Sequence, residues 1–259
     1  MTNMENKDES SENLGKKIFF LHPTLTVQSQ VIEELIQEEF EVYSVKDHSN
    51  ITRVLKKYPD SIVFLNIDEK IPKPEWEKWV RATMTALPKI SIGVMSANAE
   101  EEVKQKYTEE LKVPCGFNNL NLDMTRSIPK ILDTLKLVNA KGRRKYLRAS
   151  VERETVATLN LPFGNDYINA TINDISVVGV SCSFEQDPEL KKNTLFKDVQ
   201  IKLHTTLLKV EAIVFGSRMS GPIKNYVLLF TQRLDPEMRV KIRKYVQGNL
   251  QSKMEAELK

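Results

Sequence analysis

The sequence predicts two domains of different fold class: a parallel α/β domain over residues 16–139 and an antiparallel β-barrel over residues 140–259. In the first part, short apolar runs alternate with segments whose apolar residues recur at helical spacing, the pattern of strands joined by crossover helices. In the second part, short alternating segments follow one another with turn residues between them. A chain of 259 residues is long enough for two domains of ordinary size.

The elements of the first domain follow a polar tail, residues 1–15, which we expect to be disordered. Strands are expected at residues 17–21, 40–45, 61–67, 90–95 and 113–117. Helices are expected at residues 26–39, 49–58, 74–87, 100–111 and 124–138. In the first helix, Val27, Val31, Leu35 and Ile36 form one apolar stripe. Because each strand is followed by a helix, the strands should form a parallel sheet with helices on both faces.

The order and spacing of these elements resemble the receiver domain of two-component response regulators. The resemblance implies an aspartate nucleophile at the end of the third strand and acidic Mg²⁺ ligands after the first. Asn66 stands where the family has its aspartate nucleophile, and His22 and Pro23 stand where it has its acidic Mg²⁺ ligands. Ser96 matches the family's Ser/Thr position. An amide is a poor nucleophile, so we expect a degenerate scaffold that is not phosphorylated. Asp68, two residues beyond the expected position, is the weaker alternative acceptor.

Lys141 and Gly142 end the last helix of this domain, and the pattern then changes to alternating segments. Strands are expected at residues 150–159, 167–174, 179–184, 198–203, 207–215 and 226–230. Turn residues, such as those at 163–166 and 220–222, separate them and indicate an antiparallel barrel. A helix is expected from residue 236 to 259, with apolar Met238, Ile242, Val246, Leu250 and Met254 on one face. The pattern leaves open whether its far end projects or self-associates.

Two short motifs at the start of the barrel point to a ligand. Arg144 and Arg148 lie four residues apart, so their planar donor groups can close on one anion, chelate phosphate oxygens or stack on a base. Asp174 follows 26 positions after Arg148 and leads the run that contains Ser176 and Gly179. A carboxylate can accept hydrogen bonds from guanine N–H groups, and a glycine lets the backbone come close to a neighbour. Together they predict recognition of a phosphorylated guanine nucleotide.

In this order and interval, RxxxR followed by DxSxxG, the chain resembles the PilZ family of bacterial cyclic di-GMP receptors over residues 141 to 248. The Leu-Asp-Pro-Glu run at residues 234–237 resembles the start of the helix that usually closes such domains. The sequence matches the signature at every position, Arg144, Arg148, Asp174, Ser176 and Gly179. The resemblance implies a six-stranded barrel. The ligand-binding residues that it implies are Arg143, Arg144, Arg148, Asp174, Ser176 and Gly179.

Arg143, immediately before the signature, bears on stoichiometry. In the PilZ family an arginine at this position tends to accompany capture of two intercalated ligand molecules, and an apolar residue tends to accompany one. A third guanidinium can offset the charge of four phosphates and stack on the outer guanine. The resemblance therefore implies two cyclic di-GMP molecules per chain, whereas the plainer interpretation makes Arg143 a solvated linker residue.

The expected function is that of a non-enzymatic cyclic di-GMP effector without cofactor or metal, in which ligand binding orders residues 142–148 and resets the domain arrangement. The resemblance suggests an output in motility, attachment or virulence through an unidentified protein partner. No apolar run approaches the ~20 residues of a membrane span, and the first residues lack a signal-peptide core, so we expect a cytoplasmic protein.

The charge distribution supports an anionic ligand and leaves one alternative open. Residues 1–140 hold 18 Lys and Arg against 22 Asp and Glu, whereas residues 141–259 hold 20 against 13. A basic domain attracts phosphates, so a nucleic-acid-binding regulator is the alternative. Motifs for zinc peptidases, P-loops and serine hydrolases are absent from the sequence, and the three histidines are scattered, which argues against an enzyme. Trp76 and Trp79 are expected to pack in the core rather than bind a partner.

Overall fold

The computed structural model describes residues 15–98, 100–121, 124–151, 157–231 and 234–259. They form two compact units: residues up to Lys145 together with Gln251–Lys259, and Tyr146–Leu250. Each unit has its own hydrophobic core. The predicted tail, residues 1–15, lies outside the described residues except for Gly15.

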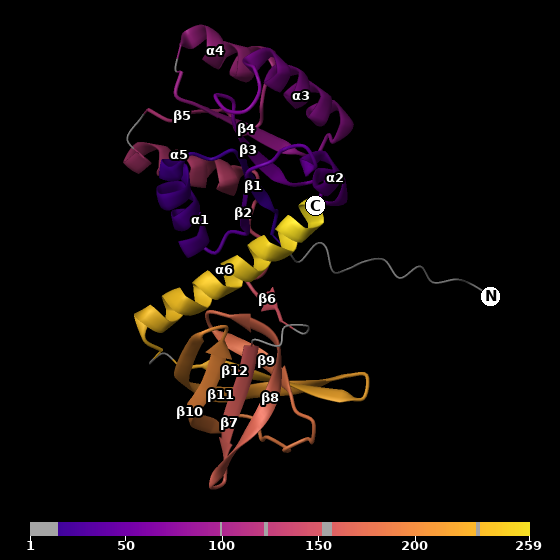
Figure 1. The fold of residues 1–259 in the computed structure, drawn as a ribbon, viewed down its shortest axis with the longest axis vertical. Helices are drawn as coiled ribbons and strands as arrows, with labels where there is room; N and C mark the ends of the chain where they lie inside the picture. The colour runs from indigo at the N-terminus through magenta and orange to yellow at the C-terminus, as the bar shows by residue number, and fades with distance from the viewer. Residues whose placement is uncertain (1–14, 99, 122–123, 152–156, 232–233) are drawn as a thin grey trace, which may run out of the picture. The chain divides into compact units, whose positions relative to one another are not determined.

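A five-stranded parallel sheet forms the centre of the N-terminal unit (Figure 1). Its strands are β1 (Ile18–Leu21), β2 (Val42–Val45), β3 (Ile62–Asn66), β4 (Ser91–Ser96) and β5 (Phe117–Asn119). They lie in the order β2-β1-β3-β4-β5, a common order of doubly wound α/β folds. Residues on both faces of β1, β3 and β4 are buried, as expected where helices cover both sides of a parallel sheet. The predicted fold class is confirmed.

The helices of this unit match the predicted order. They are η1 (Val27–Ile32) continuing into α1 (Glu33–Gln37), α2 (Ile51–Lys57), α3 (Lys73–Ala86), α4 (Glu101–Gln105) continuing into η2 (Lys106–Glu110), and α5 (Met124–Leu137). The predicted stripe of the first helix is buried. Trp76 is fully buried, and its indole N–H donates to the carbonyl of Glu69 at 2.9 Å. This tryptophan is therefore a core residue.

The prediction of the fifth strand at residues 113–117 was wrong, because the strand begins only at Phe117. Pro114 has no N–H to donate to a neighbouring strand. Gly116 adopts a φ of +65°, and its N–H donates to the carbonyl of Val113 at 3.0 Å. Residues 113–115 therefore lead into a turn, and the strand begins after it.

Six antiparallel strands form the closed barrel of the second unit (Figure 1). They are β7 (Ala157–Phe163), β8 (Asp166–Ser176), β9 (Gly179–Ser183), β10 (Leu195–Leu203), β11 (Thr206–Ser220) and β12 (Ile223–Phe230). The order β8-β7-β10-β11-β12-β9 closes because β9 pairs with β8. A two-residue strand, β6 (Ala149–Ser150), pairs with β8 from outside this ring. The six-stranded barrel is confirmed.

Several strand boundaries of the barrel differ from the prediction; β10, for example, begins at Leu195 instead of residue 198. The first predicted strand, residues 150–159, is in fact two strands, β6 and β7, and residues 152–156 lie outside the described part. The hairpin of β11 and β12 is longer than predicted and reaches a turn at Gly221, whose φ is +60°. The closing helix α6 (Pro236–Leu258) has the predicted extent, and its Ile242, Val246 and Met254 are buried.

Candidate ligand-binding site on the barrel

The second motif forms the tight connection between β8 and β9. Ser176 ends β8 and Gly179 begins β9, with two residues between them. The Ser176 hydroxyl is buried, donates to the carbonyl of Gly179 at 3.3 Å and accepts from the N–H of Val178 at 3.4 Å. A Cβ on Gly179 would lie 2.3 Å from the carbonyl oxygen of Leu228 on β12, closer than any side chain allows. Ser176 and Gly179 therefore stabilise the tight turn that follows Asp174 at the end of β8.

Arg148 and Asp174 lie side by side on the outer surface of this hairpin. The short strand β6 places Ser150 opposite Asp174, and the N–H of Val151 donates to the carbonyl of Asn173 at 2.9 Å. Arg148 immediately precedes β6, and its Nη1 lies 3.6 Å from Asp174 Oδ1. The side chains are 46% and 25% exposed, so both remain open to a ligand. The structure thus brings the last residue of the first motif to the first residue of the second.

The hydroxyl of Ser181, a residue that was not predicted from the sequence, also contacts the carboxylate of Asp174. It donates to Asp174 Oδ2 at 2.8 Å from the opposite strand. Side chains alternate along a strand, so Ser181 shares the outer face with Gly179 two residues earlier, and this alternation was the available signal. A second polar pair lies nearby, where Asn173 Nδ2 donates to Asn225 Oδ1 at 3.0 Å.

An apolar strip borders the polar groups on the same face. Val227 and Leu229 of β12 lie directly opposite Ser181 and Gly179 of β9, and directly paired residues point to the same side of a sheet. Both side chains are half-buried. The face therefore combines a carboxylate acceptor, a guanidinium and an apolar strip, a set suited to a planar base that carries phosphate.

Arg143 and Arg144 stand on the segment that leads into the barrel, five and four residues before Arg148. Both side chains are exposed. The chain divides between the two compact units directly after Lys145, so these two arginines are grouped with the N-terminal unit. Their participation in a site with Arg148 stays a prediction.

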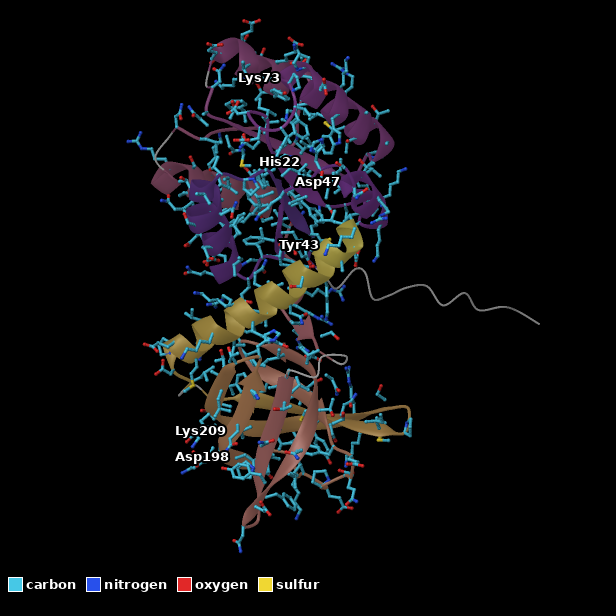
Figure 2. All side chains as sticks on the ribbon, in the orientation of Figure 1. His22, Tyr43, Asp47, Lys73, Asp198 and Lys209 are labelled. Atoms are coloured by element: carbon cyan, nitrogen blue, oxygen red, sulfur yellow. The ribbon has the colours of Figure 1, made fainter. Side chains whose placement is uncertain are left out.

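The carboxyl end of the N-terminal sheet holds the residues singled out by the receiver resemblance. Asn66 is buried, and its amide donates to the carbonyl of His22 at 3.0 Å. His22 Nε2 lies 3.0 Å from His48 Nδ1, and His22 has a φ of +51°. Asp68 accepts from the Ser96 hydroxyl at 2.8 Å and from the N–H of Ala97 at 2.6 Å. Figure 2 labels His22, together with Asp47 and Lys73, on this unit.

His22 is a buried titratable group at this end of the sheet. Burial lowers its pKa from 6.5 to about 4, and the neighbouring charges of His48 and Lys70 act in the same direction, while Asp47 opposes them. Among the described residues, no group of three or more His, Cys, Asp or Glu side chains could hold a metal ion. In the same part of the chain, no helix is long and apolar enough to cross a bilayer.

We expect the N-terminal unit to take no phosphate from acetyl phosphate, because Asn66 supplies an amide and both oxygens of Asp68 are already bonded to Ser96 and Ala97. Intact mass should be unchanged after incubation with Mg²⁺ and the donor. Asp68→Asn is the matched control. A mass gain of one phosphate in the wild type that is lost in this variant would identify Asp68 as an acceptor.

The chain is similar to several solved structures. It covers 94% of the structure described as the PilZ domain with c-di-GMP of YcgR from Escherichia coli, at 14% identity, a TM-score of 0.36 and 43% coverage of this chain. It covers 52% of the Bacillus subtilis inhibitor of motility, MotI/DgrA, at 16% identity, a TM-score of 0.37 and 43% coverage of this chain. The K. pneumonia MrkH–c-di-GMP complex has 55% of its chain covered, at 18% identity, a TM-score of 0.38 and 45% coverage of this chain.

One of these structures is a PilZ domain. The chain spans about half the length of the other two. No protein-family model and no curated protein matches the chain. Because the solved structures match less than half of this chain, the assignment of a ligand depends on the residues of its own site.

Proposed function

We propose that this chain is a non-enzymatic cytoplasmic receptor for cyclic di-GMP, with its site on the β6, β8 and β9 face of the barrel. The observation that carries the proposal is the pairing of β6 with β8, which holds Arg148 beside Asp174 on the outside of the turn formed by Ser176 and Gly179. The RxxxR and DxSxxG motifs, in the order that the PilZ family has them, support cyclic di-GMP as the ligand.

Each group has a role that its chemistry supports. Asp174 accepts from the N–H groups of a guanine edge, and Arg148, with Arg144 from the preceding segment, chelates phosphate oxygens. The ion pair of Arg148 and Asp174 is long and partly exposed, so it contributes little to stability, about 0–1 kcal/mol, and a ligand can replace it. Val227 and Leu229 offer an apolar surface for a base. Binding would therefore replace the weak ion pair of Arg148 and Asp174 by hydrogen bonds from Arg148 to phosphate and from the guanine N–H groups to Asp174.

The position of the arginines suggests how binding is transmitted. Arg143, Arg144 and Arg148 lie within six residues at the entry to the barrel, so a ligand held by all three fixes the segment that joins the two domains. The proposed consequence is a changed domain arrangement that alters contact with a protein partner. A ligand shifts such an equilibrium only by its difference in affinity for the two arrangements. Motility, attachment or virulence control is the proposed output.

Calorimetric titration of the full chain with cyclic di-GMP tests the proposal, with cyclic di-AMP as the matched control. Adenine lacks the N–H donors that guanine offers to Asp174, so only cyclic di-GMP should bind. The alternative, a nucleic-acid-binding regulator, is tested by anisotropy of a labelled DNA duplex at several salt concentrations. DNA affinity that falls steeply with salt, without binding of cyclic di-GMP, would favour the alternative.

Two cyclic di-GMP molecules per chain are expected, because Arg143 can offset phosphate charge and stack on the outer guanine of an intercalated pair. Arg143→Leu should shift the ratio toward one while binding is retained. Titration at protein concentrations well above the dissociation constant measures the equivalence point, with Lys145→Leu as the control for loss of one positive charge. One ligand per wild-type chain, unchanged in Arg143→Leu, would make Arg143 a solvated linker residue.

A further inference from the structure

The open edge of the N-terminal sheet is covered by the last turns of helix α6. Strand β2 is an edge strand, and the backbone groups of Ser44 have no strand on their outer side. Instead, the N–H of Ser44 donates to Gln251 Oε1 at 3.1 Å, and Gln251 Nε2 donates to the carbonyl of Ser44 at 2.9 Å. A single side-chain amide therefore occupies the place of a neighbouring strand. Figure 2 labels Tyr43, which precedes Ser44 on β2.

Glu257 extends this contact along the helix. Met254, which lies between Gln251 and Glu257 in the sequence, is buried, with 3% of its surface exposed. The Glu257 carboxylate lies 2.9 Å from Lys57 Nζ and accepts from the Tyr58 hydroxyl at 3.3 Å, and the pKa of Lys57 is raised mainly by its bond to Glu257. Positions 251, 254 and 257 follow at three-residue steps, so they share one face of the helix. Figure 1 shows this end of α6, in yellow, beside α2.

Charge complementarity accompanies the geometry. Helix α2 carries Arg53, Lys56 and Lys57. Residues 251–259 carry Glu255 and Glu257 together with Lys253 and Lys259, and Glu257 is the one whose carboxylate meets Lys57. Arg53 Nη2 donates to the backbone carbonyl of Glu257 at 2.5 Å. The Glu255 carboxylate accepts from Gln251 Nε2 at 2.9 Å and so orients the amide that meets Ser44. The surface formed by β2 and α2 is therefore suited to an amphipathic helix that turns a carboxylate toward the basic residues of α2.

The contact is also one that a competitor can displace. A neighbouring strand would pair with several backbone groups in a ladder, but Gln251 pairs with the two groups of one residue. The ion pair of Lys57 and Glu257 is largely exposed, and exposed pairs contribute little. Of positions 251, 254 and 257, only Met254 carries a buried apolar side chain. An uncovered edge strand is in turn a ready template for another chain.

We propose that the β2–α2 surface is a recognition site for an amphipathic helix of a partner protein that turns a carboxylate toward α2, and that the last turns of α6 are its resident occupant. The partner's helix would present an amide, an apolar side chain and a carboxylate at three-residue steps, as Gln251, Met254 and Glu257 do. The tail keeps the site closed until such a helix competes for it. This gives the N-terminal unit a role in binding that needs neither phosphorylation nor cyclic di-GMP.

The test uses a fluorescent, N-acetylated peptide of residues 245–259 and two full-length chains, the wild type and a Gln251→Ala, Met254→Ser variant. Removing the resident occupant raises the fraction of open sites, so the variant should bind the peptide at least about tenfold more tightly. A peptide with the same two substitutions should not bind. Lys57→Glu in the variant chain should weaken binding, whereas the same charge change at neighbouring Lys56 should have a smaller effect.

Hydrogen–deuterium exchange of the backbone amides tests the same site by a second measurement, which does not depend on peptide affinity. The segment containing Ser44 should exchange faster in the variant than in the wild type, and the peptide should restore its protection. Tryptophan fluorescence and circular dichroism confirm that the variant is folded. The proposal is overturned by equal peptide affinity for both chains, by no peptide binding to the variant, or by exchange of the β2 segment that does not change.

Discussion

Arg148→Ala is expected to weaken cyclic di-GMP binding by roughly thirty- to a thousandfold, which corresponds to about 2–4 kcal/mol. Arg148 belongs to the same compact unit as the second motif and lies 3.6 Å from Asp174. Its guanidinium can make two parallel bonds to phosphate oxygens, which a methyl group cannot replace. Isothermal titration calorimetry of the full chain measures the change.

Matched variants separate this effect from general loss of charge or stability. Arg239→Ala removes a positive charge from α6 of the same unit, and Asp166→Ala removes a negative charge from the far end of β8. Both should bind as the wild type does, whereas Asp174→Ala should lose affinity. The Arg148→Ala chain should unfold within about 1 kcal/mol of the wild type, because the exposed ion pair contributes little. Wild-type affinity in both Arg148→Ala and Asp174→Ala would place the site elsewhere.

The elements that the sequence predicted best are those fixed by local pattern. Val27, Val31 and Leu35 recur at helical spacing, and they are buried as the spacing requires. The turns at Gly164 and Gly221 have positive φ, the conformation for which glycine is favoured. The beginning of β5 was predicted too early, because the apolar run that starts at Val113 contains Pro114, which has no N–H to donate to a neighbouring strand.

The candidate site was predicted as a list of residues but not as a geometry. The meeting of Arg148 with Asp174 depends on β6, a two-residue pairing too short to leave a periodic signal. Ser176 and Gly179 were expected at the ligand, and the structure uses both of them inside the turn, with Gly179 packed against the backbone of Leu228. Their contact with a ligand stays a prediction.

No local sequence pattern predicted the contacts between segments that lie far apart in the chain. The end of α6 was expected either to project or to self-associate, yet Gln251 bonds to Ser44 at a separation of 207 residues. Helical periodicity identified Met254 as part of an apolar face, and its side chain is buried. The contact depends on the fold of the N-terminal sheet, because β2 is its edge strand and the outer backbone groups of Ser44 are open to Gln251.

The N-terminal unit is expected to lose stability as the pH falls from about 6.5 to about 4. His22 has a pKa of about 4 in the folded chain and 6.5 as its ordinary value, so in this interval the unfolded chain binds the proton and the folded chain does not. Protonation therefore favours unfolding, and stability rises with pH through the window. The difference corresponds to about 3 kcal/mol between the two ends.

Urea unfolding followed by tryptophan fluorescence measures this change in the N-terminal unit alone, because the two tryptophans of the chain, Trp76 and Trp79, both lie on α3. His22→Asn removes the titrating group, and asparagine tolerates the positive φ of that position. The control is His204→Asn, an exposed histidine of the barrel with a φ of +52°. His22→Asn should flatten the pH dependence, and His204→Asn should leave it unchanged. A pH dependence equally steep in all three chains would assign the acid sensitivity to carboxylates, because their protonation would then account for the whole loss.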